Sequence, residues 1–324
     1  MQPTRGYVFG PVYSRRLGWS LGVNNIPYKV CSYTCIYCQL GRTIRLTTER
    51  RRYSSPEELV REVAEALEKH RNVDYVSFVP DGEPTLDTAL GTELRLIGEL
   101  GARTAVLTNS SLLWIEDVRR DLSEASLVSL KIDAGDEQTW RAVDRPAPGL
   151  SFQKLLEGIY VFAEERPTDI ITETMLVRGF NDDKASIEKI ADIVARVEPR
   201  RAYILVPTRP PAEDWAMPPD EERLVEAHEV FRERGLDVEL LTAPEPRAPR
   251  LRGDNPLEEV YATLAVHPLP EDVVAKLLEE AGIPAQEGLQ ALLGRGDVAR
   301  IEYRGRMFLA RRPRPAGLWR RKHG

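Results

Sequence analysis

All three cysteines of this 324-residue chain lie within one short stretch, at Cys31, Cys35 and Cys38. Thiolates with the spacing C-x3-C-x2-C can each reach a different iron of one cube-shaped [4Fe–4S] cluster, because a loop of this length wraps around three of its corners. Such clusters normally take four cysteines, and this chain has no fourth. The pattern therefore predicts a cluster with one iron left for a ligand that is not a cysteine of this protein.

The same cysteines have other interpretations. A structural zinc site of the Cys3His type needs a nearby histidine, and the closest one in the sequence is His70. A thiol redox pair needs only Cys35 and Cys38, which leaves Cys31 unexplained. Buried unreactive cysteines normally scatter among core positions. The cluster prediction accounts for all three residues, while zinc and thiol chemistry stay open as alternatives.

The stretch CSYTCIYC (31–38) resembles the cluster loop of the radical S-adenosylmethionine (SAM) superfamily, in which an aromatic residue, here Tyr37, precedes the last cysteine. The similarity extends over about residues 8–240, to the branch that includes wyosine-synthase-like iron–sulfur oxidoreductases. It is carried by GPVYSRRLGWSLGVNNIP, QLGRT, FVPDGEPTLD, LTNSSLLW, SLKIDA and TETMLVRGFND. Wyosine synthases hold a second cluster on additional cysteines, and this chain has none.

The resemblance implies an enzyme with two cofactors, the [4Fe–4S] cluster and SAM. SAM chelates the open iron through its amino and carboxylate groups. An electron from an external donor such as flavodoxin or ferredoxin then breaks SAM into methionine and a 5′-deoxyadenosyl radical, which removes hydrogen from a substrate. The cofactors carry the difficult chemistry, and the protein supplies binding and orientation.

The resemblance also assigns SAM contacts to residues near several predicted strand ends. Asp81-Gly82-Glu83 is similar to the family's Gly-Gly-Glu motif; its first glycine is here Asp81, and Gly82 still permits close backbone approach. The other predicted SAM-binding residues are Tyr37, Asn109, Ser110, Lys131, Asp133, Val177, Arg178 and Asn181. Structural alternatives are a turn with solvated acids at Asp81 to Glu83, a helix N-cap at Asn109 or Ser110, a salt bridge between Lys131 and Asp133, and a helix cap at Asn181.

Arg15 and Arg16 precede the cysteine loop. They have two interpretations, a group of cations that holds an anion near the active site and an ordinary surface turn. His228 lies within a predicted helix and His267 precedes a proline. We expect both histidines to be structural.

The elements that must position these residues alternate between apolar runs and amphipathic stretches, which is typical of repeated βα units around a parallel sheet. Strands are predicted at 20–26, 73–79, 103–108, 127–133, 170–177 and 202–207, and helices at 55–70, 87–100, 112–123, 151–165, 183–197 and 220–234. Six units are too few for a closed eight-stranded barrel. The sequence therefore predicts an α/β fold, a partial (β/α)6 TIM-type barrel.

The pattern changes after a linker rich in Pro and Arg. Two short helices at 270–282 and 284–296 and a hairpin that turns at Arg304-Gly305 suggest a small winged-helix-like domain. We expect the radical SAM partial barrel at 1–243, the linker at 244–258 and the winged-helix-like domain with a basic tail at 259–324. Net charge is −6, yet residues 295–324 carry +8, which is a cue for an anionic partner.

The remaining expectations concern location and substrate. No apolar run approaches the roughly 18 residues of a membrane span, and no secretion signal precedes the first motifs, so we expect a cytoplasmic protein without a membrane partner. The basic tail makes RNA, with a tRNA base as the modified group, one candidate substrate. A small molecule or protein side chain is the alternative, and a nucleic-acid-binding iron–sulfur sensor without SAM cleavage is another. The sequence assigns no catalytic residue beyond the SAM contacts.

Overall fold

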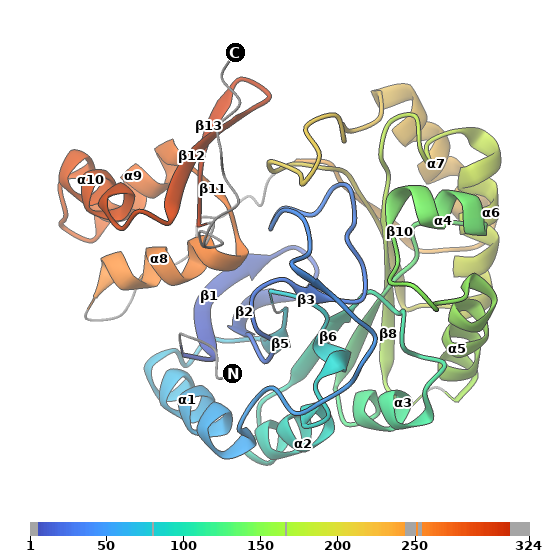
Figure 1. Cartoon of the computed structure of the whole chain (residues 1–324), viewed down its shortest axis with the longest axis horizontal. Coiled ribbons are helices and arrows are strands. Elements are labelled where there is room, and N and C mark those ends of the chain that lie inside the picture. Colours follow the sequence, from blue (N-terminus) through green and yellow to red (C-terminus); the bar gives the residue numbers. More distant parts are fainter. Residues whose placement is uncertain (1–5, 80, 166, 244–250, 252–254, 312–324) are drawn as a thin grey trace.

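A curved sheet of eight strands forms the centre of the molecule (Figure 1). The computed structural model describes residues 6–79, 81–165, 167–243, 251 and 255–311. The strand order is β1-β2-β5-β6-β7-β8-β9-β10. The bounds are β1 Val8–Ser14, β2 Gly18–Val23, β5 Tyr75–Phe78, β6 Thr104–Thr108, β7 Leu127–Lys131, β8 Asp169–Met175, β9 Arg201–Leu205 and β10 Val238–Leu241. In this order, every pair of neighbouring strands from β2 to β10 is parallel. This arrangement confirms the predicted open partial barrel.

The two edge strands, β1 and β10, lie outside the sequence prediction. β1 pairs antiparallel with β2 and contains an irregularity in register between Phe9 and Val12, where Gly-Pro interrupts the strand pattern. β10 has only four residues, one of which is Glu239. A short strand with a charged residue carries too weak a pattern to be recognised from sequence.

Helices cover the outer face of the sheet (Figure 1). Their bounds are α1 Pro56–Lys69, α2 Leu90–Glu99, α3 Glu116–Leu122, α4 Glu137–Val143, α5 Phe152–Glu165, α6 Lys184–Val197 and α7 Glu221–Glu233. In α1, Pro56 occupies the first turn and Leu59 and Val63 are fully buried, as the helical spacing predicts. Ser55 stands at the N-cap position, but its side chain caps no backbone N–H.

The inner face of the sheet is built in layers, because side chains two residues apart on a strand share a face. The first layer is apolar and closes the amino-terminal end of the barrel; it consists of Tyr75, Ala105, Leu127, Ile171, Tyr203 and Leu241 together with Leu17. Two residues further along, Ser77, Ser129 and Glu173 place polar atoms inside the barrel. This polar layer forms the floor of the cavities described below.

The C-terminal segment folds around its own apolar core, to which Val260, Leu264, Leu278 and Leu309 contribute. Its elements are α8 Pro256–Val266, β11 Leu269–Pro270, α9 Glu271–Glu280, α10 Ala285–Gly294, β12 Val298–Tyr303 and β13 Arg306–Arg311, with sheet order β11-β13-β12. Arg304 and Gly305 both have positive φ, 51° and 71°, as a two-residue hairpin turn requires.

The order helix, strand, helix, helix, strand, strand is the order that a winged helix has, and the winged-helix assignment stays a prediction. The helix α8 begins within the segment expected to be linker. The basic residues from 312 to 324 lie outside the described part of the chain.

This C-terminal domain lies beside β1, with α8 packed against that strand (Figure 1). Tyr303 donates its hydroxyl to the carbonyl of Pro207 at 3.0 Å, beyond the end of β9. Gln39 of the cysteine loop donates to the carbonyl of Val266 at 2.7 Å. The domain is therefore fastened to the same end of the barrel as the cysteine loop.

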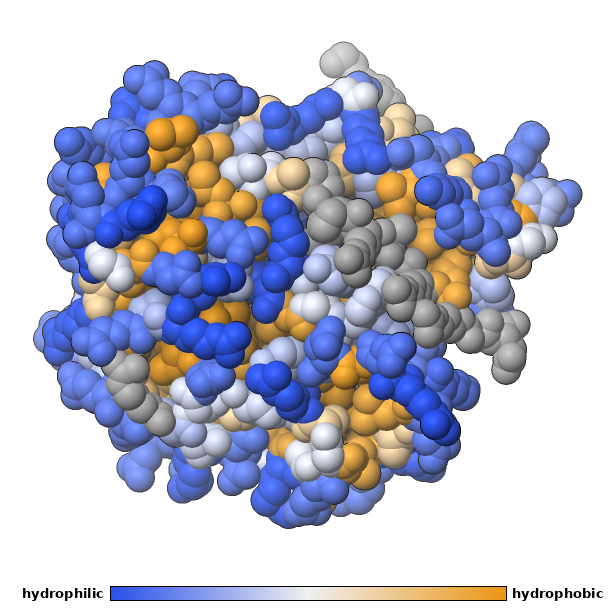
Figure 2. All heavy atoms as spheres, turned by 180° about the vertical axis from the view of Figure 1, so that it is seen from behind, coloured by the Kyte–Doolittle hydropathy of each residue, from blue (hydrophilic) through white to orange (hydrophobic). Residues whose placement is uncertain are grey.

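The surface is mainly charged and polar on the face shown in Figure 2, where apolar side chains are exposed between charged ones. Among the described helices, none combines the length and apolar character needed to cross a bilayer.

Candidate iron–sulfur and SAM site

The cysteine loop is held at both of its ends and along its length. The short strand β3, Val30–Cys31, pairs in parallel with β4, Arg45–Leu46, which brings the two ends of the loop together. Backbone hydrogen bonds then tie the loop to the end of α4 and the segment after it: Ile36 N donates to Val143 O at 3.0 Å and Ala147 N to Ser32 O at 2.8 Å. The loop thus lies in a fixed position across the carboxyl ends of the barrel strands, where parallel βα folds place their sites.

The three cysteines line one cavity of about 200 Å³, which we call the cluster cavity. Its lining also includes Asp81, Gly82, Glu83, Asn109 and Lys131 from the predicted SAM motifs. In the described part of the chain, no three His, Cys, Asp or Glu side chains are arranged around a single metal ion. All three cysteines line the same cavity, as ligands of one polynuclear cluster must.

Two lysines, the buried Lys29 and the half-buried Lys131, donate hydrogen bonds to the sulfurs. Lys29 Nζ lies 3.2 Å from Cys38 Sγ, and Lys131 Nζ lies 3.1 Å from Cys35 Sγ. Burial alone would raise the pKa of Cys38, but the charge of Lys29 and its hydrogen bond bring that pKa below the usual value. Burial and the nearby Glu83 carboxylate raise the pKa of Cys31 to about 11.

Cys35 also lies beside a carboxylate. Burial is the main cause that raises its pKa well above the usual value; the charge of Lys131 lowers it and that of Asp144 raises it again. The Cys35 Sγ to Asp144 Oδ1 distance is 3.3 Å. Since cluster ligation requires thiolates, the two ammonium groups provide positive charge that partly balances the three thiolates, of which Cys35 is buried.

Glu83 joins the ends of two strands. Its Oε1 accepts hydrogen bonds from Thr85 Oγ1 and Thr108 Oγ1, each at 2.6 Å, and its Oε2 accepts one from Asn109 N at 2.8 Å. Burial raises the pKa of Glu83, and these hydrogen bonds oppose that shift. Oε2 keeps capacity for a further donor.

Gly82 packs against the strand that leads into the cysteine loop. A Cβ at Gly82 would lie 1.8 Å from the carbonyl oxygen of Val30, so only glycine fits here. Asn109 also contacts the cysteine loop, because its Nδ2 donates to Ser32 Oγ at 2.8 Å and lies 3.6 Å from Cys31 Sγ.

Lys131, Tyr37 and Asp133 form one network around the buried Asp133 carboxylate. Lys131 donates to the hydroxyl of Tyr37, which donates to Asp133, and Lys131 Nζ lies 3.4 Å from Asp133 Oδ2. Burial raises the pKa of Asp133 to about 7, because the lowering effect of Lys131 is partly offset by Asp144. The predicted Lys131–Asp133 pair is present, and Tyr37 bridges it.

Five of the predicted residues lie away from the described lining of the cluster cavity: Asp133, which reaches it only through Tyr37 and Lys131, and Ser110, Val177, Arg178 and Asn181. Arg178 forms an ion pair with Asp220 at 2.6 Å on the surface. Val177 is fully buried in a small apolar group with Ile36 and Ala216.

Asn181 is fully buried and its amide is fully used. Its Nδ2 donates to the carbonyls of Asp133 and Met175, each at 2.8 Å, and its Oδ1 accepts from Val177 N at 2.7 Å. Asn181 therefore clamps the ends of β7 and β8 together. Ser110 is also buried, at a positive φ of 67°.

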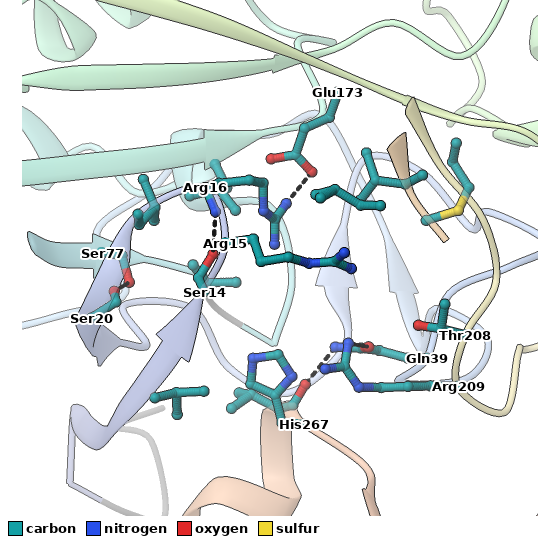
Figure 3. Close-up of a pocket in the computed structure, with 18 of the residues that line it drawn as sticks. Ser14, Arg15, Arg16, Ser20, Gln39, Ser77, Glu173, Thr208, Arg209 and His267 are labelled. Atoms are coloured by element: carbon teal, nitrogen blue, oxygen red, sulfur yellow. Dashed lines mark hydrogen bonds and ion pairs between the residues drawn. The ribbon is translucent and has the colours of Figure 1, made fainter. Parts of the chain in front are cut away.

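A second cavity, of about 300 Å³, continues from the first. The two share Tyr37, Cys38, Leu40, Leu107 and Glu173 in their linings. We call it the arginine cavity, because Arg15, Arg16 and Arg209 line it together with His267 (Figure 3). His267, expected to be structural, thus faces a cavity next to the cysteines.

Three of the site's residues escaped the sequence analysis: Lys29, Thr108 as a partner of Glu83, and Asp144. Lys29 stands two positions before Cys31, a spacing that a search for cations near the cysteines would find. Asp144 lies more than one hundred residues from Cys35 in the sequence, and no local pattern connects them.

An open α/β barrel with three cysteines facing a cavity at the carboxyl ends of its strands defines a class of iron–sulfur enzyme, and comparisons with known proteins make the class specific. The chain belongs to the radical SAM superfamily, whose family model, "Radical SAM superfamily", matches residues 25–193. Enzymes of this superfamily use a [4Fe–4S] cluster and SAM, and the three cysteines, two lysines and close-packed Gly82 of the cluster cavity fit that pair of cofactors.

Three relatives illustrate the range. The chain is 39% identical over 303 residues to "UPF0026 protein MJ1312" of Methanocaldococcus jannaschii, which covers 93% of this chain and 94% of that protein. It is 23% identical over 221 residues to a "Probable dual-specificity RNA methyltransferase RlmN" of Thermotoga sp., covering 65% of this chain and 61% of that one. A solved radical SAM methyltransferase from Sphaerobacter thermophilus has the same fold, with a TM-score of 0.54 at 18% identity over 69% of this chain and 66% of that chain.

Proposed function

We propose that this enzyme cleaves SAM reductively at a [4Fe–4S] cluster ligated by Cys31, Cys35 and Cys38, and that the product abstracts hydrogen from a substrate in the arginine cavity. The observation that carries the proposal is the shared wall of the two cavities, which contains Cys38 and Tyr37. A substrate bound in the second cavity would lie directly beside the cofactors in the first. An external carrier such as flavodoxin or ferredoxin would deliver the electron.

The protein's residues bind and orient the cofactors. When bound, the cluster and SAM supply a one-electron cleavage that yields methionine and a 5′-deoxyadenosyl radical. Glu83 Oε2 and the backbone at Asp81 and Gly82 offer acceptors for the amino group of SAM. Asn109 and Lys131 offer donors for its carboxylate, and Lys131 is kept charged by the thiolates and carboxylates around it. The C-terminal domain and the cysteine loop enclose this end of the barrel and limit access of water and oxygen.

The test is anaerobic reconstitution with iron and sulfide, followed by reduction with dithionite and assay of 5′-deoxyadenosine. We expect SAM cleavage by the native chain and none by Cys35→Ser. Arg42→Gln is the matched control, since Arg42 belongs to the same loop but its side chain is 72% exposed and pairs with Glu213. A reconstituted, reduced native protein that forms no 5′-deoxyadenosine with SAM would overturn the proposal.

RNA is a second candidate substrate, favoured by the similarity to a protein named as an RNA methyltransferase. The described part of the basic segment offers less charge than the sequence suggests, because four of its arginines form ion pairs within the domain. These pairs are Arg295–Glu258, Arg300–Glu271, Arg306–Asp272 and Arg311–Asp297. The RNA candidate therefore depends mainly on the cations of residues 312–324, which are not described.

The salt dependence of tRNA binding separates RNA from a substrate held in the arginine cavity. Phosphate contacts by five cations would make log K for tRNA fall with log salt at a slope of roughly 4 in magnitude. Filter binding of total tRNA at 50 and 200 mM salt, with the full chain and with a chain that ends at Arg311, measures this slope. No binding at 50 mM would dismiss the RNA candidate.

A further inference from the structure

A carboxylate stands where the cluster cavity and the arginine cavity meet. The described residues that line both cavities are Tyr37, Cys38, Leu40, Leu107 and Glu173. Among these residues, Glu173 is the one with a carboxylate. A substrate in the arginine cavity whose reacting carbon faces the cofactors therefore lies next to this side chain.

The other polar groups of the shared wall already have partners or a role. The hydroxyl of Tyr37 forms two hydrogen bonds, one to Asp133 and one from Lys131. The sulfur of Cys38 is a cluster ligand in the proposed function. The two leucines of the wall are apolar. Recognition of a polar group at this wall therefore depends on Glu173.

Two neighbours hold the Glu173 carboxylate. Ser129 Oγ donates to its Oε1 at 2.6 Å, and Arg16 forms an ion pair with its Oε2. The side chains of Arg16 and Glu173 are 16% and 15% exposed. Because a carboxylate can accept about four hydrogen bonds, each oxygen keeps capacity for a further donor. Glu173 is thus an acceptor whose orientation is fixed before any ligand binds.

Glu173 lies at the end of the arginine cavity that is next to the cysteines. In Figure 3 it lies on the opposite side of the cavity from His267. Glu173 also lines the cluster cavity, whereas His267 does not belong to the described lining of that cavity. A donor group bound to Glu173 therefore lies at the cofactor end, and the rest of the ligand extends toward the C-terminal domain.

The guanidinium groups of the arginine cavity do not call for an anionic ligand. Arg16 is paired with Glu173. Arg15 and Arg209 each donate to a neutral oxygen, and both have further interactions within the chain. All three arginines are therefore engaged by the protein itself.

The same guanidinium groups act against a cationic ligand. Burial, followed by the charges of Arg209 and Arg16, lowers the pKa of His267 well below its usual value. The imidazole is therefore uncharged near neutral pH. Surroundings that disfavour an imidazolium also disfavour an ammonium group, because both are cations. We therefore expect the donor that Glu173 accepts to be uncharged.

Much of the remaining wall is apolar. Phe9, Val12, Met175, Leu205 and Val206 are among its residues. The cavity volume of about 300 Å³ is at the lower end of the range for small-molecule pockets. The lining therefore fits a small, mainly apolar body that carries one donor group.

We propose that Glu173 binds an uncharged hydrogen-bond donor, a hydroxyl or an amide N–H, of a small and mainly apolar substrate. The bond places the carbon next to that donor at the shared wall of the two cavities, and so sets which C–H bond faces the cofactors. This inference rests on the proposed radical SAM function, since it names the substrate class for that site. Glu173 accepts a hydrogen bond in this role and exchanges no proton.

A matched series of small aromatic probes tests the inference without SAM or reductant. The probes are para-fluorobenzyl alcohol, which has a hydroxyl donor, its methyl ether, which has no donor, and para-fluorobenzylamine, which has a cationic donor. Fluorine NMR titrations with the reconstituted full chain measure the Kd of each probe. We expect the alcohol to bind about fivefold more tightly than the ether and than the amine.

Glu173→Gln replaces one acceptor oxygen by a donor group at nearly unchanged size. In this variant the alcohol and the ether should bind with affinities within about twofold of each other. The ether should bind the variant as it binds the native chain, which shows that the cavity is intact. Glu137→Gln is the matched control, since Glu137 is an exposed acid paired with Arg141 on α4, and it should keep the native preference.

Thr208→Trp places the probes in the arginine cavity. Thr208 is half-buried in the wall of that cavity, so the larger side chain should fill the volume and weaken the binding of all three probes. SAM titrated into the oxidised, reconstituted Glu173→Gln protein should bind as it does to the native chain, because the proposed partner of Glu173 is the substrate.

Equal affinity of the native chain for the alcohol and the ether overturns the inference, as does a preference for the alcohol that persists in Glu173→Gln. Tighter binding of the amine than of the alcohol, unchanged probe binding in Thr208→Trp, or no binding of any probe also overturns it. If Glu173→Gln loses affinity for SAM while the preference for the alcohol stays, Glu173 contacts SAM instead. Normal probe binding without formation of 5′-deoxyadenosine counts against the proposed function alone.

Discussion

At the scale of single residues, the main feature is the pairing of each of two sulfurs with the ammonium group of a buried or half-buried lysine. Lys29 is 3% exposed and lies against Cys38, and Lys131 lies against Cys35. A buried charge is costly unless it is paired. The lysine ammonium groups and the cysteine thiolates therefore stabilise each other. When a cluster is bound, the negative charge of the ligated cluster would stabilise the ammonium groups instead.

Lys29→Gln is expected to lower the reduction potential of the cluster, because it removes a positive charge that stabilises the reduced, more negative state. The expected shift is on the order of 60 mV, which corresponds to a tenfold change for one electron. A mediator titration followed by electron paramagnetic resonance measures it. Lys189→Gln, at an exposed lysine paired with Asp136, should leave the potential unchanged. An equal potential in native and Lys29→Gln proteins would show that this contact does not tune the cluster.

Asn181→Ala is expected to destabilise the protein by about 2–4 kcal/mol, because it leaves the buried carbonyl of Asp133, the partly buried carbonyl of Met175 and the buried N–H of Val177 without their partner. Urea denaturation of the cluster-free protein measures the free energy of unfolding. Arg178→Ala, which removes an exposed ion pair with Asp220 and a hydrogen bond to the carbonyl of Pro218, should cost about 1 kcal/mol. If Asn181→Ala weakened SAM binding with unchanged stability, the ligand role predicted from sequence would be correct instead.

At the scale of elements, the sequence predicts those parts of the fold whose pattern is local. The strands β5 to β9 are found within a few residues of their predicted bounds, since buried parallel strands read as continuous apolar runs. The edge strand β10 has only four residues, one of them charged, and α4 stands between β7 and α5 without a strand of its own, so the βα alternation does not predict it.

The same distinction applies to the site. The cysteines, Asp81 to Glu83, Asn109 and Lys131 follow strand ends and so could be predicted to meet. The positions of Asn181 and His267 in the fold depend on turns and domain contacts, which cannot be predicted from the spacing of residues in the sequence. Asn181 faces inward to clamp β7 and β8, and His267 reaches its cavity only because α8 packs on β1.

Helix α2 contains a buried acid that predicts a pH dependence of stability. Burial and the neighbouring Asp87 raise the pKa of Glu93 to about 8 from a usual value of 4.5, although Ser54 donates to it. The folded state then binds more protons than the unfolded chain between these two pH values. Stability from this group is complete below about pH 4.5 and falls as the pH rises through 8.

Between pH 6 and pH 9, the free energy of unfolding should therefore decline by about 1–3 kcal/mol less in Glu93→Gln than in the native protein. Urea denaturation of the cluster-free protein at several pH values measures this slope. Glu99→Gln lies at the end of the same helix, in an exposed pair with Arg95, and should keep the native slope. Identical slopes for native and Glu93→Gln proteins would contradict the raised pKa.

At the scale of the whole molecule, the C-terminal domain completes the site. It meets the barrel through Tyr303 and Pro207, through Gln39 and Val266, and through α8 on β1. Gln39 directly follows Cys38, so the same few residues join the cluster loop, the domain and the arginine cavity. The domain contributes Val266 and His267 to the wall of the arginine cavity, and we expect its position to limit the access of solvent to the cysteines.

Tyr303→Phe tests this coupling, because it removes one buried hydrogen bond between the domain and the barrel and leaves the carbonyl of Pro207 without that partner. The docked state should lose about 1–2 kcal/mol. Hydrogen exchange should become faster at residues 205–209 and 266–270, and the reconstituted cluster should bleach faster in air, as followed by its visible absorbance. Tyr261→Phe is the matched control, since Tyr261 bonds Asp297 at 2.9 Å inside the domain. If Tyr303→Phe bleaches no faster than Tyr261→Phe, then the domain does not shield the cluster, and its contribution to the site is confined to the side chains it places in the arginine cavity.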